Sequence, residues 1–263
     1  LSVLSQRDII EFDHLSIEQG LSQSTIFCII QDHKGYMWFG TEDGLNRYDG
    51  YEFEIFNSDD SKRNSIKNNR VIDLLEDKTN TLWVATIGGG LNKFDYKTET
   101  FSHYIHNPTD STSISNNRVM ALCEDPSGKI WVATADGGFN LFKPETERFE
   151  VFMNTPENPN FIPDNVISSL HVDSKGLLWV VTSNGLCSFT YKTKKVTPVT
   201  IIDSNGDEYQ INIVRAIFED ASGNIWIGTD NEGVVCYLTN EDKFTIYKND
   251  SKQRLRYRFQ SKY

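Results

Sequence analysis

The stretch 125–138, which reads Asp-Pro-Ser-Gly-Lys-Ile-Trp-Val-Ala-Thr-Ala-Asp-Gly-Gly, decides the fold because it occurs in five related copies. Each copy contains one of the five tryptophans, and consecutive tryptophans are 45, 48, 48 and 47 residues apart. An Asp lies six residues before every Trp, and a Thr lies three residues after it. A fixed period of about 40–50 residues predicts a repeat architecture. The tryptophans are Trp38, Trp83, Trp131, Trp179 and Trp226.

Each repeat contains four short runs of strand-forming residues. In the third copy these runs are 119–124, 130–134, 139–142 and 149–152, and Gly, Asp, Asn or Pro residues separate them. Runs of this length with such boundaries predict strands rather than helices. Four strands per repeat are typical of one blade of a β-propeller.

The turn between the first two strands of each repeat supports this interpretation. Four copies have the pattern Asp-x-x-Gly, which suits a type I turn followed by a residue in the left-handed conformation. The second copy has Asn80 in place of the glycine. Asn tolerates that conformation better than most other non-glycine residues, so the exception fits the same turn.

We expect the repeated Trp to pack between neighbouring blades, where its loss would cost about 3–5 kcal/mol. We also expect the first strand of each blade to lie near the propeller axis, where space is limited. The residue four positions before each turn Asp is small or short, which fits that position. These residues are Cys28, Asp73, Ala121, Ser169 and Ala216.

The sequence therefore predicts an all-β fold, a β-propeller of four-stranded antiparallel blades, with five blades in a single domain over residues 1–263. The predicted blades are 26–56, 71–104, 119–152, 166–199 and 213–247. Residues 12–15 resemble a fourth strand and are predicted to close a ring. Residues 248–263 form a tail that contains a basic stretch.

Two arrangements of the ring fit this pattern. Blade five already has its own fourth strand at 244–247, so residues 12–15 have no blade to complete. Either the ring closes at five blades with residues 12–15 left over, or the chain forms an incomplete part of a larger ring. We favour the incomplete ring. It would leave blade edges exposed, and exposed edges favour pairing with a second copy as a homodimer.

Composition excludes several classes of protein. The chain has 37 acidic and 26 basic residues and a net charge of −11, which argues against nucleic-acid partners and anionic membrane surfaces. No apolar run reaches the length needed to span a bilayer, and residues 1–10 show no signal-peptide pattern. The four cysteines form no Cys-x-x-Cys pair, so we expect buried free thiols and neither a metal site nor a cofactor.

The repeat, written Glu-Asp-x-x-Gly-x-x-Trp-[VIF]-[GA]-Thr-x-x-Gly-Gly-[LFV], resembles the two-component regulator propeller repeat. The run Gly-Tyr-Met-Trp-Phe-Gly-Thr-Glu-Asp-Gly-Leu-Asn-Arg-Tyr-Asp-Gly at 35–50 is especially similar to the family's first blade. The resemblance covers about residues 12–247. Departures that we expect to leave the fold intact occur at Asn80, Val172, Val181 and Glu232.

The resemblance implies a periplasmic sensor domain of a hybrid histidine kinase, in which two seven-bladed propellers typically precede the membrane helix and the kinase. It implies that this chain is the first part of a seven-bladed ring. Many receptors of the family respond to oligosaccharides, so the implied partners are an oligosaccharide ligand and downstream domains of the same receptor. Any kinase activity would lie outside this chain, and the chain itself is not expected to be an enzyme.

Candidate ligand-binding residues are those that break the symmetry of the repeat. Asp73 occupies a small inner-strand position, and Arg215 replaces Ile72 and Met120 in the inner strand of blade five. Arg70 and Arg118 directly precede the inner strands of blades two and three. The hypothesis is that Arg70, Arg118 and Arg215 surround one mouth of the channel.

Two other functions remain open: a propeller hydrolase or lyase that acts on a polysaccharide, and a protein-interaction scaffold. The sequence shows no phosphate-binding loop and no catalytic triad order. Paired carboxylates of a glycosidase cannot be placed among 37 acidic residues. Sensing without catalysis is therefore the favoured function.

Overall fold

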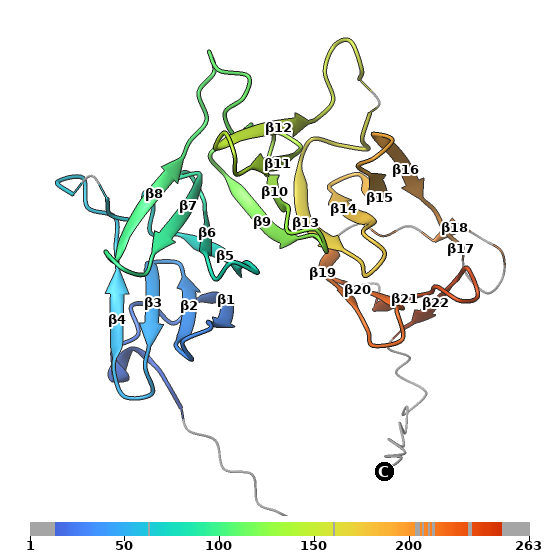
Figure 1. The fold of residues 1–263 in the computed structure, drawn as a ribbon. Coiled ribbons are helices and arrows are strands. Elements are labelled where there is room, and N and C mark those ends of the chain that lie inside the picture. The colour runs from blue at the N-terminus through green and yellow to red at the C-terminus, as the bar shows by residue number, and fades with distance from the viewer. Residues whose placement is uncertain are drawn as a thin grey trace, which may run out of the picture.

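The structure is a computed structural model, and it describes residues 14–62, 64–159, 161–202, 206, 208, 209, 211, 214–230 and 233–248. Five antiparallel sheets of four strands each follow one another along the chain (Figure 1). Within every sheet the strands pair in chain order. The predicted all-β propeller of five four-stranded blades is confirmed.

The blades consist of the following strands. Blade one contains β1 (Ile26–Gln31), β2 (Met37–Thr41), β3 (Gly44–Tyr48) and β4 (Phe53–Phe56). Blade two contains β5 (Val71–Glu76), β6 (Leu82–Thr86), β7 (Leu91–Asp95) and β8 (Thr100–Tyr104). Blade three contains β9 (Val119–Glu124), β10 (Ile130–Thr134), β11 (Phe139–Lys143) and β12 (Arg148–Phe152). Blade four contains β13 (Ile167–Val172), β14 (Leu178–Thr182), β15 (Gly185–Thr190) and β16 (Lys195–Val199). Blade five contains β19 (Val214–Glu219), β20 (Ile225–Thr229), β21 (Val234–Leu238) and β22 (Lys243–Tyr247).

In the part of the chain that the structure describes, three short elements lie outside the blades. The 3₁₀ helix η1 (Ile17–Gln19) precedes blade one, and β17 (Ile201–Ile202) pairs with β18 (Glu208–Tyr209) between blades four and five. Of the predicted closing strand, residues 12 and 13 lie outside the described residues, while His14 and Leu15 belong to no strand. In the predicted tail, residues 249–263 likewise lie outside the described residues.

The first strand of each blade is the innermost one. The inner strands contact one another in series, from β1 to β5, then β9, β13 and β19. Figure 1 shows the resulting open arc, with β1 and β19 at its two ends. Prediction and structure agree on the inner position of these strands.

Four apolar clusters lie between consecutive blades, and we call each such interface a seam. The cluster of seam 1–2 joins Trp38 of blade one to Leu74 and Phe94 of blade two. The other three seams are also apolar, with Trp83, Trp131 and Trp179 in the position of Trp38. The core is thus a row of seams, and the prediction that the Trp packs between blades is confirmed for four of the five tryptophans.

The outer faces of the two end blades have no neighbouring blade in the described part of the chain. Trp226 faces outward from blade five and is half-buried, whereas the other four tryptophans are buried. On blade one Ile29 is 51% exposed, although the equivalent Leu74, Leu122 and Leu170 are 5%, 7% and 6% exposed. Both ends of the arc therefore present faces that, in the interior blades, are covered by a neighbour.

The spacing of Asp and Trp in the repeat has a direct structural cause. In every blade the indole nitrogen of the Trp donates a hydrogen bond to the turn Asp six residues earlier, at 2.7–3.4 Å. The other carboxylate oxygen accepts backbone N–H groups of the turn, as Asp125 does from Ser127 and Lys129. Asn80 has a φ of 61°, so it adopts the left-handed conformation predicted for it.

The described residues contain no helix that is long and apolar enough to cross a membrane. All four cysteines are free thiols, as predicted. Cys187 and Cys236 are buried, while Cys28 and Cys123 are half-buried. Burial raises the pKa of the Cys187 thiol to about 12, which makes it a poor nucleophile at neutral pH.

Candidate functional site

The predicted ligand-binding residues gather where the inner strands begin, on a side of the arc that we call the axial face. The connectors between blades reach this face and are attached to it by backbone hydrogen bonds. The amide nitrogens of Gly44, Gly90 and Gly138 donate to carbonyl oxygens in the following connectors, at 2.7–2.9 Å. Because these bonds repeat, the residues that start β5, β9 and β13 are held in equivalent places.

Each predicted arginine on the axial face has an acidic partner. Arg70 pairs with Glu42 of the preceding blade, with 3.2 Å between Nε and Oε2. Arg118 pairs with Asp136 at 3.5 Å.

Arg215 pairs with Asp230 at 2.9 Å. The pairs of Arg118 and Arg215 each lie within one blade. The expected ring of arginines is thus corrected: three separate ion pairs occupy the face, because neighbouring turns supply a carboxylate to each guanidinium. Exposed pairs of this kind contribute little to stability because water screens their charges, so a ligand can compete for them at low cost.

Asp73 connects two blades through backbone groups. Its Oδ1 accepts a hydrogen bond from Leu74 N at 2.9 Å, and its Oδ2 accepts one from Leu122 N of blade three at 2.7 Å. Burial raises the pKa of the Asp73 carboxyl to about 6, and the two N–H donors oppose that rise. These contacts define a structural role across seam 2–3, while its role as a ligand contact stays a prediction.

A feature that the sequence analysis missed is a β-bulge in every inner strand. In each case one residue of the inner strand has no partner on the second strand of its blade. A bulge bends the strand and redirects its side chain. The bulged residues are Phe27, Ile72, Met120, Ser168 and Arg215. Aligning Phe27 with Ile72, Met120 and Arg215 would have revealed it as a further departure from symmetry.

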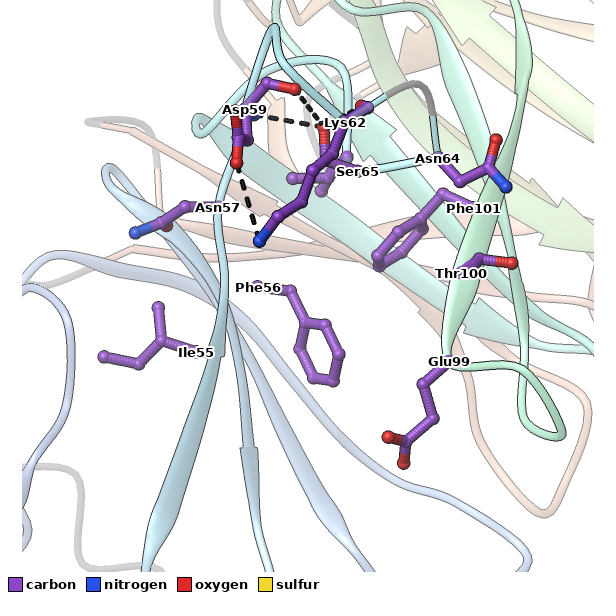
Figure 2. A pocket seen from close by; sticks show the side chains of 11 residues that line it. Ile55, Phe56, Asn57, Asp59, Lys62, Asn64, Ser65, Glu99, Thr100 and Phe101 are labelled. Atoms are coloured by element: carbon purple, nitrogen blue, oxygen red, sulfur yellow. Dashed lines mark hydrogen bonds and ion pairs between the residues drawn. The ribbon is translucent and has the colours of Figure 1, made fainter.

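A groove of about 560 Å³ lies at the outer rim between blades one and two. Figure 2 shows Lys62 reaching toward Asp59 above the rings of Phe56 and Phe101. Lys62 Nζ and Asp59 Oδ2 are 3.5 Å apart, and Ser65 Oγ accepts a hydrogen bond from Asp59 N at 3.0 Å. The connector side chains in this groove therefore bond largely to one another.

An equivalent groove of about 620 Å³ lies between blades two and three. It is lined by Tyr104, Ser113, Ile114 and Phe149, which take the places of Phe56, Ser65, Ile66 and Phe101. Because the repeat itself generates both grooves, they are explained by blade packing. The symmetry-breaking residues of the axial face are the stronger candidate for a site. Within the described residues no group of three metal-ligating side chains comes together.

Comparison with known proteins identifies the class. The model of the two component regulator propeller family matches residues 20–43, 65–88, 113–136, 162–184 and 208–231, one segment per blade. The recognition of this family from the repeat is therefore confirmed, and the five repeats are two-component regulator propeller repeats.

Individual relatives agree with the family match. The extracellular domain of the hybrid two component system BT3049 from B. thetaiotaomicron is 30% identical, with a TM-score of 0.77 over 89% of this chain and 31% of that chain. The extracellular domain of BT4673 from B. thetaiotaomicron is 23% identical, with a TM-score of 0.73 over 90% of this chain and 33% of that chain, and it supports the fold alone.

A curated relative, Histidine kinase P4 of Formosa agariphila, is 38% identical over 66 residues. That match covers 25% of this chain and 5% of the relative. The chain thus spans about a third of the extracellular domains and a small part of the kinase. These relatives are a histidine kinase and the extracellular domains of bacterial regulatory systems.

Proposed function

We propose that this chain is part of the extracytoplasmic sensor domain of a two-component receptor, and that it binds an oligosaccharide without turning it over. The observation that carries the proposal is the match to the extracellular domain of BT3049, which extends over 89% of this chain at 30% identity. A periplasmic or otherwise extracytoplasmic location belongs to the same proposal.

The axial face supports an uncharged, hydroxyl-rich ligand. Each of its three arginines pairs with a carboxylate, so the surface offers hydrogen-bond donors and acceptors side by side with little local net charge. Sugar hydroxyl groups both donate and accept, and they can bond to a guanidinium and a carboxylate at once. The net charge of −11 for the whole chain also disfavours highly anionic ligands.

Signal transfer would use the open ends of the arc. We propose that further repeats cover the exposed faces near Ile29 and Trp226 and complete a seven-bladed ring. Downstream domains of the receptor would then respond to ligand binding. A ligand shifts such an equilibrium only by the difference between its affinities for the two arrangements.

The test is a thermal melt of this chain with a panel of neutral and acidic oligosaccharides, followed by chromatography of the same samples for cleavage products. A ligand at 100 times its dissociation constant stabilises the folded state by about 2.7 kcal/mol, which is a readable shift. A selective shift without products supports the sensor. Products would support a hydrolase or lyase, and an unchanged melting temperature with every sugar would favour a protein-interaction scaffold.

A further inference from the structure

The bulge in each inner strand places one residue per blade at the axial face, and these five residues differ in chemistry. Residues just before the bulge are buried in four blades, as Val71 and Val119 are. The bulged residues themselves are half-buried or exposed. Phe27 is the aromatic member of this set, since the others are Ile72, Met120, Ser168 and Arg215.

Phe27 lies beside a charged pair that can bond to hydroxyl groups. Its side chain is 40% exposed, and the guanidinium carbon of Arg70 is 5.5 Å from the centre of its ring. Arg70 in turn pairs with Glu42 at 3.2 Å. An accessible aromatic ring, a donor and an acceptor therefore lie together on the axial face, supplied by blade one and the connector to blade two.

The open end of the arc is not the whole reason for the exposure of Phe27. Ile29, on the same strand, is exposed because no blade precedes it, and its counterparts in interior blades are buried. The counterparts of Phe27 stay accessible even where blades lie on both sides, as Met120 and Ser168 do. The bulge, which every blade shares, therefore contributes to the accessibility of Phe27.

We propose that Phe27, Arg70 and Glu42 form a subsite for one pyranose ring of a neutral oligosaccharide. The polarised C–H groups on one face of the sugar would stack on the electron-rich face of the Phe27 ring. Hydroxyl groups at the edge of the sugar would accept from Arg70 and donate to Glu42. A neutral sugar suits this subsite because the guanidinium charge is already balanced by a carboxylate. The inference rests on the proposed oligosaccharide-sensing function and names the part of the surface that carries it.

The experiment compares wild type with Phe27→Ala, Phe27→Tyr and Ile29→Ala by isothermal titration calorimetry. The probes are cellotriose, xylotriose and maltotriose, with trigalacturonate as the anionic comparison. Phe27→Ala is expected to weaken binding of the recognised neutral sugar roughly tenfold, the size of one stacking contact. Phe27→Tyr keeps the ring and should stay within about threefold of wild type. Ile29→Ala removes an exposed apolar side chain from the same strand and should leave affinity unchanged.

Glu42→Gln separates neutral from anionic ligands. Losing the carboxylate should weaken a neutral sugar, whereas it would tighten trigalacturonate by freeing the Arg70 charge. If wild type binds a neutral sugar and Phe27→Ala binds it equally well, the subsite is wrong while the proposed function stands. If trigalacturonate alone binds and Glu42→Gln tightens it, the neutral class is wrong. If no probe binds wild type at concentrations up to about 10 mM, the proposed function and the subsite are both rejected.

Discussion

Seams 2–3 and 3–4 join equivalent blades but differ in the hydrogen bonds between a carboxylate of one blade and the backbone of the other. Across seam 2–3 the Glu124 carboxylate accepts hydrogen bonds from Lys78 N at 3.1 and 3.2 Å, and Asp73 accepts one from Leu122 N. Across seam 3–4 the position of Glu124 is taken by Val172, and the position of Lys78 is taken by Pro126. Proline has no backbone N–H to donate, so a carboxylate at 172 would lack this partner.

The hydrogen bond between a Glu and the preceding turn is the rule in the other described seams. Glu76 accepts from His33 N at 2.8 Å in seam 1–2, and Glu219 accepts from Ser174 N at 2.7 Å in seam 4–5. Val172 is thus matched by Pro126, one blade earlier. The comparison teaches that two departures from the repeat can belong together, one at a hydrogen-bond donor position and one at the acceptor position of the next blade.

Seam 3–4 keeps an aromatic cluster, as seam 2–3 does where the ring centres of Trp83 and Phe142 lie 4.9 Å apart. Phe189 of blade four lies with its ring centre 5.8 Å from Trp131, 5.1 Å from Phe139 and 4.9 Å from Phe152. All four side chains are buried. Aromatic pairs at these distances add about 0.5–1.5 kcal/mol each beyond the area that they bury.

Disrupting the aromatic cluster of seam 3–4 should give the largest effect. Trp131→Ala should lower the free energy of unfolding by about 3–5 kcal/mol, because a buried ring leaves a cavity among Phe139, Phe152 and Phe189. The matched variant Trp226→Ala should cost clearly less, since Trp226 is half-buried on the uncovered face of blade five. Urea denaturation of the two variants measures the difference. Equal losses would contradict the view that the face of blade five lacks a neighbour.

The stability of seam 2–3 should depend on pH through Asp73. The carboxyl has a pKa of about 6 in the folded state and an ordinary value of 3.8, so ionisation is less favourable in the folded protein. Wild type should therefore lose stability relative to Asp73→Asn as pH rises from about 4 to 6, by up to about 3 kcal/mol, and the difference should stay constant above that range. Thermal melts of both proteins from pH 4 to 8 measure it.

A control for this pH dependence is available in the same fold. Ser169→Ala changes the equivalent position of blade four, where no carboxylate is present. The stability difference between Ser169→Ala and wild type should not vary with pH. If the stability difference between Asp73→Asn and wild type were also independent of pH, the Asp73 carboxyl would not be forced to ionise between the blades.

The smallest effect is expected from building the missing hydrogen bond into seam 3–4. Val172→Glu alone should cost about 1–2 kcal/mol, because it replaces an apolar contact with a carboxylate that has no donor. Adding Pro126→Ala restores an N–H group at the donor position, so the double variant should regain about 1 kcal/mol relative to additive behaviour. A double-mutant cycle in urea measures this coupling. Strict additivity would mean that the two positions do not face each other.

The amino-acid sequence by itself determined the propeller, its five blades and the placement of four of the five tryptophans between blades. Repeated spacing carries this information, because each blade must bury the same face against the next one. Local chemistry was also readable: Asn80 adopts the left-handed conformation that the turn demands. The family match follows from the same positions, since they recur in every repeat.

Only the tertiary structure decided which residues meet across seams and on the axial face. Arg70 was predicted, but its partner Glu42 and its position beside Phe27 depend on where two blades approach each other. Asp73 looked like a ligand contact in sequence, yet its carboxylate bonds to backbone groups of two blades. The correspondence between Pro126 and Val172 could not be predicted from the sequence for the same reason. A repeat specifies what one blade contains, whereas contacts between different residues of neighbouring blades are set by the geometry that brings them together.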